Sequence, residues 1–411
     1  MASVRGIYYG WWVVTAAFTV MTLGFACAYS FSAFFPELQR EFDASRATIS
    51  LVFSIGGALY FFVGAISGLL ADRFGSRWVC TIGMVFIGLG LVAAGLADSL
   101  LFVYLGFGLG IGLGVGFSYV PSVGAVQPWF TVRRGFASGL AVSGIGVGTL
   151  VGPIIASALI AAFDWRVAFM SLGLTAMIAG GIAALFIEND PTRRGSGKVE
   201  DAPGSAAGEQ PVSLSLREAM ATRPFWLLFA AAACLSFALF VPFVHLVPYS
   251  LGHGMSAATG AVMIGMVGVG STVGRFMIGS VADRIGRVDV YAACFAGVVV
   301  THFFWLFAAN PWTLGLFGFV FGSCYGGFVA LFPSIIVDYF GSRAAGAIIG
   351  ALYASVGIGT LLGPTFAGYV FDATGSYDGA ILAGELVAVV AAFLAMLLPH
   401  ARTWRRLQGL N

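Results

Sequence analysis

Long apolar runs separated by short polar segments dominate this sequence. Twelve of these runs reach about 20 residues, the length an α-helix needs to cross the hydrocarbon core of a bilayer. The pattern therefore predicts an all-α membrane protein with twelve transmembrane helices. The predicted spans lie near residues 9–35, 48–70, 78–97, 101–128, 136–160, 166–187, 223–250, 258–282, 288–308, 312–338, 344–371 and 379–399.

A polar segment separates the first six predicted spans from the last six. Residues 188–222 are rich in Pro, Gly and Ser and carry charged side chains, a composition typical of a linker. The boundaries predict an N-terminal six-helix half at 1–187, a cytoplasmic linker at 188–222 and a C-terminal six-helix half at 223–411. Within the linker, residues 214–221 are predicted to form a short surface helix.

The two halves repeat one another in sequence. GTLVGP at 148–153 recurs as GTLLGP at 359–364, and DRFG at 72–75 recurs as DRIG at 283–286. Both pairs are separated by 211 residues. A shared offset of this size indicates two homologous halves of six spans each. Parallel halves of this kind form one of the known transporter plans, with the substrate site near the middle of the membrane between them.

Composition and charge agree with this membrane interpretation. Only 9% of the 411 residues are charged, against about 25% in a typical soluble domain. With the N-terminus inside, the inner loops and tails carry sixteen basic residues, and the outer loops carry only Arg40, Arg46 and Arg166. This bias predicts a multi-pass protein of the cell (inner) membrane with both termini in the cytoplasm. The dispersed basic residues give no indication of nucleic-acid binding, and the five cysteines, which lack paired spacing, are expected to be free thiols.

One charge lies inside a predicted span. Arg275 sits in the apolar, glycine-rich run 265–287, eight residues before Asp283 and so ~12 Å from that helix end. An arginine at the centre of a span costs roughly 2.5–3.5 kcal/mol on insertion scales, and it normally faces a bundle interior or a wet cavity. Arg275 is therefore predicted to bind an anion. Snorkelling to the interface or pairing with a carboxylate are the structural alternatives.

The short loop after the second span of each half carries a recognisable motif. Residues 68–77, GLLADRFGSR, resemble the G-x-x-x-D-R-x-G-x-R loop signature of the major facilitator superfamily, and residues 279–287 repeat it. The resemblance implies the fold of that superfamily, with two six-helix pseudo-symmetric halves. It also implies a cytoplasmic gating latch, although these arginines could instead only set topology. The implied gating residues are Asp72, Arg73, Arg77, Asp283, Arg284 and Arg287.

Within that superfamily, the chain is similar to the monocarboxylate transporter family, in particular its bacterial branch, and is also related to oxalate/formate exchangers. The likeness rests on YGWWVV at 9–14, on WFTVRRGFASGLA at 129–141, and on YGGFVALFP at 325–333. Arg275 matches the arginine of the eighth span that pairs with the substrate carboxylate in the family. The resemblance covers essentially the whole chain apart from the linker and tails.

The sequence also departs from the family pattern at several positions. Tyr29 and Ser271 stand where animal members have the lysine and aspartate tied to proton coupling, which leaves the coupling residue open. Residues 346–371 contain neither the second cation of the oxalate/formate exchangers nor any other lysine or arginine. One cavity cation suits a monoanion, because a dicarboxylate would leave one charge unpaired in a low dielectric.

The remaining site candidates are polar side chains within apolar spans. The predicted substrate-binding residues are Arg275, Tyr119, Tyr325, Tyr353, Tyr29 and Ser143, because a few placed polar groups in an apolar pocket are typical of ligand sites. His245 and Glu385 are the candidates for proton coupling. For each of them apart from Arg275, an ordinary packed or hydrogen-bonded structural role is the alternative.

These features together predict a secondary active transporter that moves a small, lactate- or pyruvate-like monocarboxylate with a proton by alternating access. A carboxylate exchanger of the oxalate/formate type is the alternative within the same fold, and a non-transporting membrane sensor is the alternative outside it. The expected partners are the carboxylate, the proton and the lipid bilayer, with the monomer as the functional unit. No metal site, cofactor or enzymatic activity is expected, since the sequence lacks the corresponding motifs.

Overall fold

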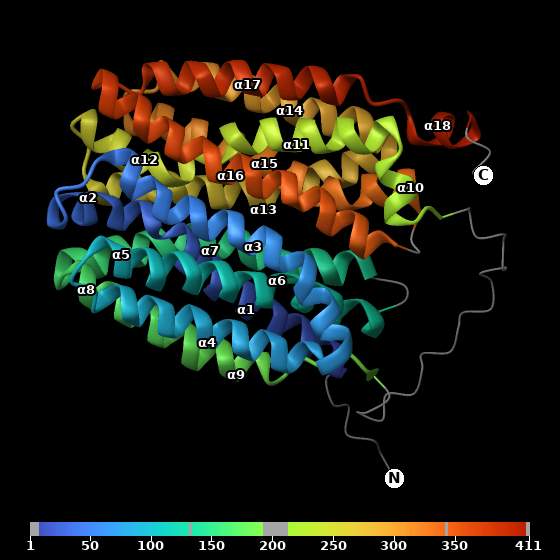
Figure 1. Ribbon diagram of the computed structural model, residues 1–411, viewed down its shortest axis with the longest axis horizontal. Helices are drawn as coiled ribbons and strands as arrows, with labels where there is room; N and C mark the ends of the chain where they lie inside the picture. Colours follow the sequence, from blue (N-terminus) through green and yellow to red (C-terminus); the bar gives the residue numbers. More distant parts are fainter. Residues whose placement is uncertain (1–7, 131–133, 192–212, 342–343, 408–411) are drawn as a thin grey trace, which may run out of the picture.

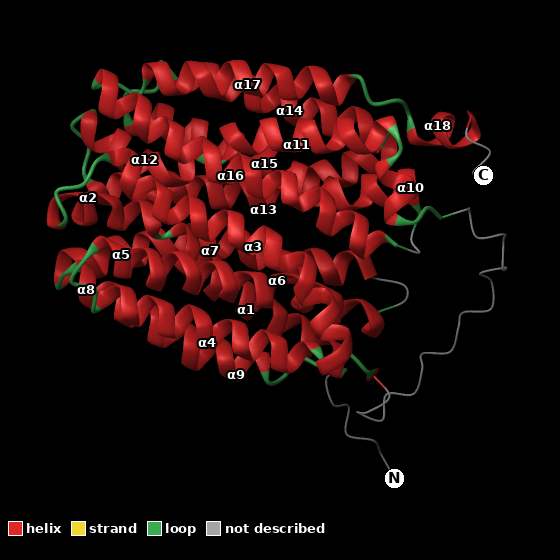
Figure 2. Cartoon of the chain, in the orientation of Figure 1, coloured by secondary structure: helices red, strands yellow, loops and turns green. Residues whose placement is uncertain are grey.

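The computed structural model describes residues 8–130, 134–191, 213–341 and 344–407. All regular structure in these residues is helical (Figure 2). Twelve helical segments are long and apolar enough to cross a membrane, which confirms the predicted number of spans. The helices of the first six spans are α1 (Tyr9–Tyr29), α2 (Phe31–Glu41), α3 (Arg46–Phe74), α4 (Ser76–Gly95), α5 (Leu100–Val103), η1 (Tyr104–Leu109), α6 (Gly110–Val126), η2 (Gln127–Trp129), α7 (Arg134–Ala162), α8 (Trp165–Thr175), η3 (Ala176–Gly180) and α9 (Gly181–Ala184).

The second six spans follow a short helix, α10 (Leu216–Met220), which lies within the predicted surface helix and begins with a capping box of Ser215 and Glu218. The later helices are α11 (Arg223–Leu239), α12 (Val241–Gly252), α13 (Ala257–Ile285), α14 (Arg287–Trp305), α15 (Pro311–Phe340), α16 (Ala345–Thr374), α17 (Asp378–Met396) and α18 (Ala401–Leu407). Most of the predicted linker, residues 192–212, lies outside the described residues, so the domain boundaries stay a prediction.

The long helices run side by side along one axis (Figure 1). In that view α1, α4, α6, α8 and α9 lie below, α11, α12 and α14–α17 lie above, and α3, α7 and α13 lie between them. We call the end that carries Asp72 and Asp283 the signature end. It lies at the right of Figure 1 together with α10 and α18. The other end, where α3 begins at Arg46, is the opposite end.

The internal repeat is visible in helix contacts as well as in sequence. A Cβ at Gly148 or Gly152 of α7 would overlap the backbone carbonyls of Thr22 or Ala26 in α1. At the 211-residue offset, a Cβ at Gly359 or Gly363 of α16 would overlap the backbone carbonyls of Ala233 and Phe237 in α11. Small residues let helix backbones approach closely in a membrane. The same glycine pair therefore packs the fifth span on the first and the eleventh on the seventh.

Two spans are interrupted at equivalent points. The first span breaks at Ser30, between α1 and α2, and the seventh breaks at Phe240, between α11 and α12. Pro242 lies at the start of α12, where the N–H group that proline lacks is not needed. The breaks place aromatic side chains of both halves in the interior, where Tyr29 stacks on Phe243 with ring centroids 4.4 Å apart.

Candidate functional site

Arg275 lies near the middle of α13 and is almost completely buried, with 7% of its surface exposed. Its Nη1 donates a hydrogen bond to the backbone carbonyl of Val142 in α7, at 2.9 Å. Its Nε and Nη2 are buried and have no hydrogen-bond partner among the described residues. The guanidinium also forms no ion pair with a carboxylate in the part of the chain that the structure describes. Both structural alternatives for this arginine, snorkelling and ion pairing, therefore disagree with its geometry.

A cavity of about 30 Å³ lies between the two halves and is lined mainly by aromatic side chains. Five tyrosines line this central cavity: Tyr29, Tyr60, Tyr119, Tyr325 and Tyr353. The hydroxyls of Tyr29 and Tyr325 lie 3.0 Å apart and form a hydrogen bond between the halves. The hydroxyls of Tyr119 and Tyr353 interact with each other, and Tyr119, Tyr325 and Tyr353 interact electrostatically with the Arg275 guanidinium. Three of the four predicted tyrosines thus lie beside the buried cation, and the fourth, Tyr29, joins them through Tyr325.

Tyr60 belongs to this cluster, but the sequence analysis missed it. It is 4% exposed, and its hydroxyl makes no hydrogen bond of good geometry with any described residue. The repeat contains a signal that identifies it, because Tyr60 is the 211-residue counterpart of Ser271. Ser271 lies one helical turn before Arg275, and its hydroxyl is also buried without a partner among the described residues.

A second cavity, of about 260 Å³, adjoins the first on the side of the signature end. The two cavities share Tyr60, Phe61, Tyr119 and Tyr353 in their linings. The second cavity extends between α3, α6 and α16 as far as Asp72, at the end of α3. The central cavity therefore continues toward the signature end.

Arg275 and three other predicted residues do not line the central cavity, although the Arg275 guanidinium interacts electrostatically with three of its tyrosines. The Ser143 hydroxyl donates to the carbonyl of Leu140 in its own helix and does not line the cavity, although Ser143 follows Val142, the partner of Arg275. Glu385 lies on α17 and lines neither cavity, and its Oε2 is buried without a partner among the described residues. His245 is fully buried near the opposite end, in contact with Pro364 and Tyr377.

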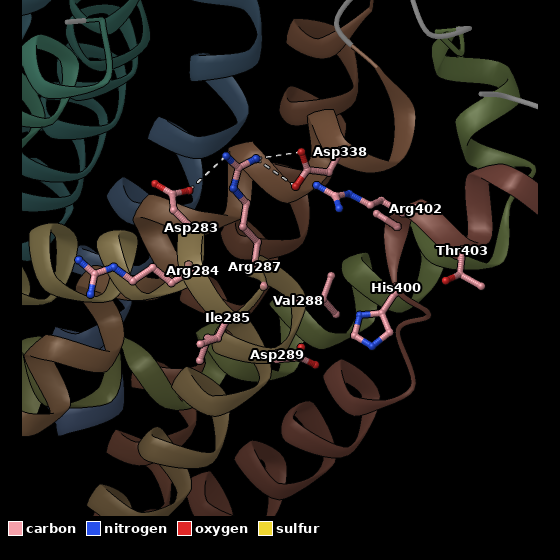
Figure 3. A pocket seen from close by; sticks show the side chains of 13 residues that line it. Asp283, Arg284, Ile285, Arg287, Val288, Asp289, Asp338, His400, Arg402 and Thr403 are labelled. Carbon is pink, nitrogen blue, oxygen red and sulfur yellow. Dashed lines mark hydrogen bonds and ion pairs between the residues drawn. The ribbon is translucent and has the colours of Figure 1, made fainter.

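The second copy of the loop signature forms an ion-pair cluster (Figure 3). Arg287 Nη1 lies 2.9 and 3.1 Å from the two carboxylate oxygens of Asp338, and Arg287 Nη2 lies 3.4 Å from Asp283. Arg284 lines the same pocket and points away from this cluster. Asp338 lies near the end of α15, so the ion pairs stay among helices of the second half.

The first copy of the loop signature has different partners. Arg77 donates to Glu188 at 3.0 Å and to the carbonyl of Ile187 at 3.2 Å, and the Arg73 guanidinium lies 5.3 Å from the centre of the Phe74 ring. Asp72 forms no ion pair or hydrogen bond with any residue described by the structure. Gly75 and its counterpart Gly286 have φ angles of 87° and 115°, a backbone conformation that favours glycine and explains its place in the motif. A latch between the halves therefore stays a prediction.

The fold and the site define a class of protein, a twelve-span membrane transporter with a buried cation between two six-helix halves. Comparison with known proteins identifies the family. The sequence profile of the Major Facilitator Superfamily matches residues 15–287 and 253–408, so the chain belongs to this superfamily. Its members are transporters rather than enzymes, which confirms the predicted fold and the predicted class of function.

Individual relatives agree with this assignment. Monocarboxylate transporter 11 of Homo sapiens is 27% identical over 413 aligned residues, which cover 96% of this chain and 83% of the relative. Monocarboxylate transporter 13 of Bos taurus is 26% identical, with 95% and 90% covered. The crystal structure of a bacterial homolog of the human lysosomal transporter Spinster, inward-facing and unoccupied, has a TM-score of 0.73 at 16% identity and 98% coverage of each chain. The resemblance to monocarboxylate transporters is thus confirmed.

Proposed function

We propose that this transporter moves a small monocarboxylate, such as a lactate- or pyruvate-like anion, together with a proton. The observation that carries the proposal is the buried Arg275 guanidinium with Nε and Nη2 unpartnered among the described residues. These two nitrogens form one edge of the guanidinium, and their N–H groups match the two oxygens of a carboxylate. A bound carboxylate would neutralise the buried charge and occupy both donors.

The charge and the size of the site support a small monoanion. Among the buried polar residues of the described chain, only Arg275 and Arg405 carry a permanent charge, and Arg405 lies in α18 at the signature end. The central cavity of about 30 Å³ continues into the second cavity of about 260 Å³, and together they have room for a small anion. We assign Tyr119, Tyr325, Tyr353 and Tyr29 to the walls of the substrate site, with Ser143 next to the helix turn that holds Arg275.

The proposed cycle alternates access to the central cavity. The two halves would rock about the site, and the signature-end residues Asp72, Arg73, Arg77, Asp283, Arg284 and Arg287 would gate the cytoplasmic side. This orientation places both termini in the cytoplasm and the protein in the cell (inner) membrane, as the arginine bias favours. The monomer is the proposed functional unit, because the cavity lies within one chain.

Uptake by purified protein in proteoliposomes tests the proposal. With membrane voltage clamped by potassium and valinomycin, an inward proton gradient should drive accumulation of labelled lactate or pyruvate. Arg275→Lys should reduce uptake more than tenfold, because lysine keeps the charge but loses the fork that fits a carboxylate. Arg405→Lys is the matched control, a second buried arginine in α18 away from the central tyrosines, and it should retain uptake. Normal uptake by Arg275→Lys would contradict the site.

The same assay separates symport from exchange. If a pH gradient gives no accumulation while an internal load of unlabelled carboxylate does, the protein is an exchanger of the oxalate/formate type. Under symport, His245→Ala should lose gradient-driven accumulation and keep counterflow. Glu385→Gln is the second variant to compare, because Glu385 is the other candidate for the coupled proton. A variant that keeps both activities clears its residue of the coupling role.

A further inference from the structure

At the opposite end, a carboxylate from the second half holds the start of α3. The Asp372 oxygens Oδ1 and Oδ2 accept hydrogen bonds from the backbone N–H groups of Arg46 and Ala47, each at 2.9 Å. Ser45 accepts from the N–H group of Thr48 at 3.2 Å. The first N–H groups of a helix lack partners within the helix and carry partial positive charge. Asp372 therefore ties the end of α16 to the N-terminus of α3.

A chain of side chains crosses the same junction. The Arg46 guanidinium lies 3.6 Å from the centre of the Phe371 ring, and its Nη1 donates to the Tyr377 hydroxyl at 2.5 Å. The Tyr377 oxygen lies 3.0 Å from Nδ1 of His245, and Nε2 of His245 lies 2.8 Å from the carbonyl oxygen of Pro364. The chain thus runs from α3 through the start of α17 and α12 to α16.

This hydrogen-bond chain is complete only when His245 is neutral. A carbonyl oxygen only accepts, so Nε2 carries a hydrogen and donates it to Pro364. With Nδ1 unprotonated, the Tyr377 oxygen accepts from Arg46 and the Tyr377 hydroxyl donates its own hydrogen to Nδ1, so every group of the chain has a partner. A proton on Nδ1 would make His245 and Arg46 donate to one hydroxyl and would leave the Tyr377 hydrogen without this acceptor. The charged groups facing His245 are Arg46 from α3 and Asp372 from α16, while Phe35 from α2 is uncharged.

The repeat gives a natural comparison for this junction. At the 211-residue offset, α7 and α13 stand in the places of α16 and α3. Six polar residues of the α3–α16 junction have an apolar or glycine counterpart there, whereas Ser45 corresponds to Ser256 and Tyr377 to Arg166. Arg46, Ser50, Ser54, His245, Thr365 and Asp372 correspond in order to Ala257, Ala261, Gly265, Phe34, Ile154 and Ala161. Because the duplicated packing does not require these polar groups, their presence in one junction points to a task that the other lacks.

We propose that this polar junction is the outer gate of the transporter and that protonation of His245 opens it. Asp372 and the chain from Arg46 to Pro364 hold the gate shut while His245 is neutral. A proton arriving from outside breaks the chain and frees α3 from α16, which would open the central cavity on that side. The gate follows from contacts between the halves and does not depend on the substrate. Its response to protons rests on the proposed proton coupling.

Distance measurements between spin labels test the gate without any substrate. Asp98 and Trp312 are exposed at the opposite end, one in each half and both outside the junction. Labels on cysteines at these two positions, in a background without the native cysteines, report the separation of the halves. The unsubstituted gate should give mainly short distances at pH 8, and a long-distance population should grow at pH 5, below the ordinary pKa of histidine of about 6.5.

Two variants separate the parts of the gate. Asp372→Ala should raise the ratio of long to short distances about tenfold at pH 8, because it removes a helix cap and a charge. Asp372→Glu, which keeps the carboxylate, should recover part of the short population. His245→Gln should make the distances independent of pH, because glutamine does not take up a proton in this range.

Matched controls come from residues of the same type in the second half. Asp378→Asn removes an exposed carboxylate at the same end that forms no hydrogen bond or ion pair with the described residues of the first half, and it should leave the distances unchanged. His302→Gln removes a buried histidine that bonds to the carbonyls of Val298 and Ala238 and packs on aromatic rings of its own half, and it should keep the pH response.

Each result decides one claim. Short distances in Asp372→Ala at both pH values would overturn the gate. A pH response retained in His245→Gln, or lost in His302→Gln, would overturn the role of His245. Because no carboxylate is present, a pH-dependent opening in a protein that transports no carboxylate would contradict the proposed function and leave the gate standing.

Discussion

The two junctions between the halves have the same helical framework but differ in chemistry at the opposite end. Between α3 and α16, the junction is closed by polar contacts, including a hydrogen bond of 3.0 Å from Thr365 to Ser54. Between α7 and α13, the same end holds a crevice of about 710 Å³, lined partly by Ala158, Ala161 and Ala257. The crevice shares no lining residue with the central cavity.

This difference shows that two copies of one helix pair can have different roles when the two halves of the transporter move. Gly146, Gly265 and Gly268 bring α7 and α13 close together nearer the middle of the membrane, so this junction can act as a pivot. The hydrogen bond from Arg275 to the Val142 carbonyl crosses the same two helices at the proposed substrate site rather than at the opposite end. The α3–α16 junction carries directional hydrogen bonds and a charge, and such contacts are either made or broken. A gate needs two discrete states, whereas a pivot needs close and smooth packing.

The largest effect on the distance between the labels should come from a larger side chain in the closed α3–α16 junction. A Cβ at Gly368 of α16 would overlap the backbone of Ala47 and Arg46, whereas its counterpart in α7, Ser157, already carries a side chain. Gly368→Val should therefore force α3 and α16 apart, so that the long distance between labels at Asp98 and Trp312 predominates at every pH. Ser157→Val, the matched control in the crevice, should leave the distances unchanged. Equal effects of the two substitutions would remove the distinction between the junctions.

Much of this arrangement follows from local properties of the sequence. Span lengths follow from apolar runs, and the repeat follows from two short motifs at one offset. The burial of Arg275 follows from the cost of placing a charge in a span, and the structure places it beside Tyr119, Tyr325 and Tyr353. These features depend on composition and spacing along the chain, which is why the sequence predicts them.

Other features depend on contacts between distant positions. From the sequence, Arg46 is recognised only as a basic residue of an outer loop. Its partners Asp372 and Tyr377 lie more than 300 positions away. Tyr60 resembles any tyrosine of an apolar span until its neighbours in the cavity are known. Ser143 was predicted at the substrate, but its hydroxyl is satisfied by Leu140 of its own helix, which a sequence pattern does not reveal.

A smaller effect on the distance between the labels should come from adding a carboxylate to the crevice between α7 and α13. Ala161 is the counterpart of Asp372, and it lines the crevice together with Ala257 and Ala258, the first residues of α13. Ala161→Asp should cap the start of α13 and stabilise the closed crevice by about 1 kcal/mol, the typical value of a helix cap. The long-distance population at pH 5 should then fall several-fold. Ala161→Asn, which has one acceptor oxygen and no charge, should have a weaker effect, and an unchanged population with Asp would show that the crevice does not move.

The smallest effect on the distance between the labels should come from removing a single neutral hydrogen bond in the gate. The Thr365 hydroxyl donates to Ser54 across the junction at 3.0 Å, and Thr365→Val removes this bond while keeping the shape of the side chain. One such bond contributes about 0.5–1.5 kcal/mol, less than the combined cap and charge of Asp372, so the long-distance population at pH 8 should rise only a few-fold. Thr149→Val is the control, because the Thr149 hydroxyl is buried and, among the described residues, bonds only to Ile145 of its own helix. If Thr365→Val opened the gate as far as Asp372→Ala, the closed state would depend on this hydrogen bond rather than on the carboxylate, and the contrast between the charged and the apolar junction would lose its basis.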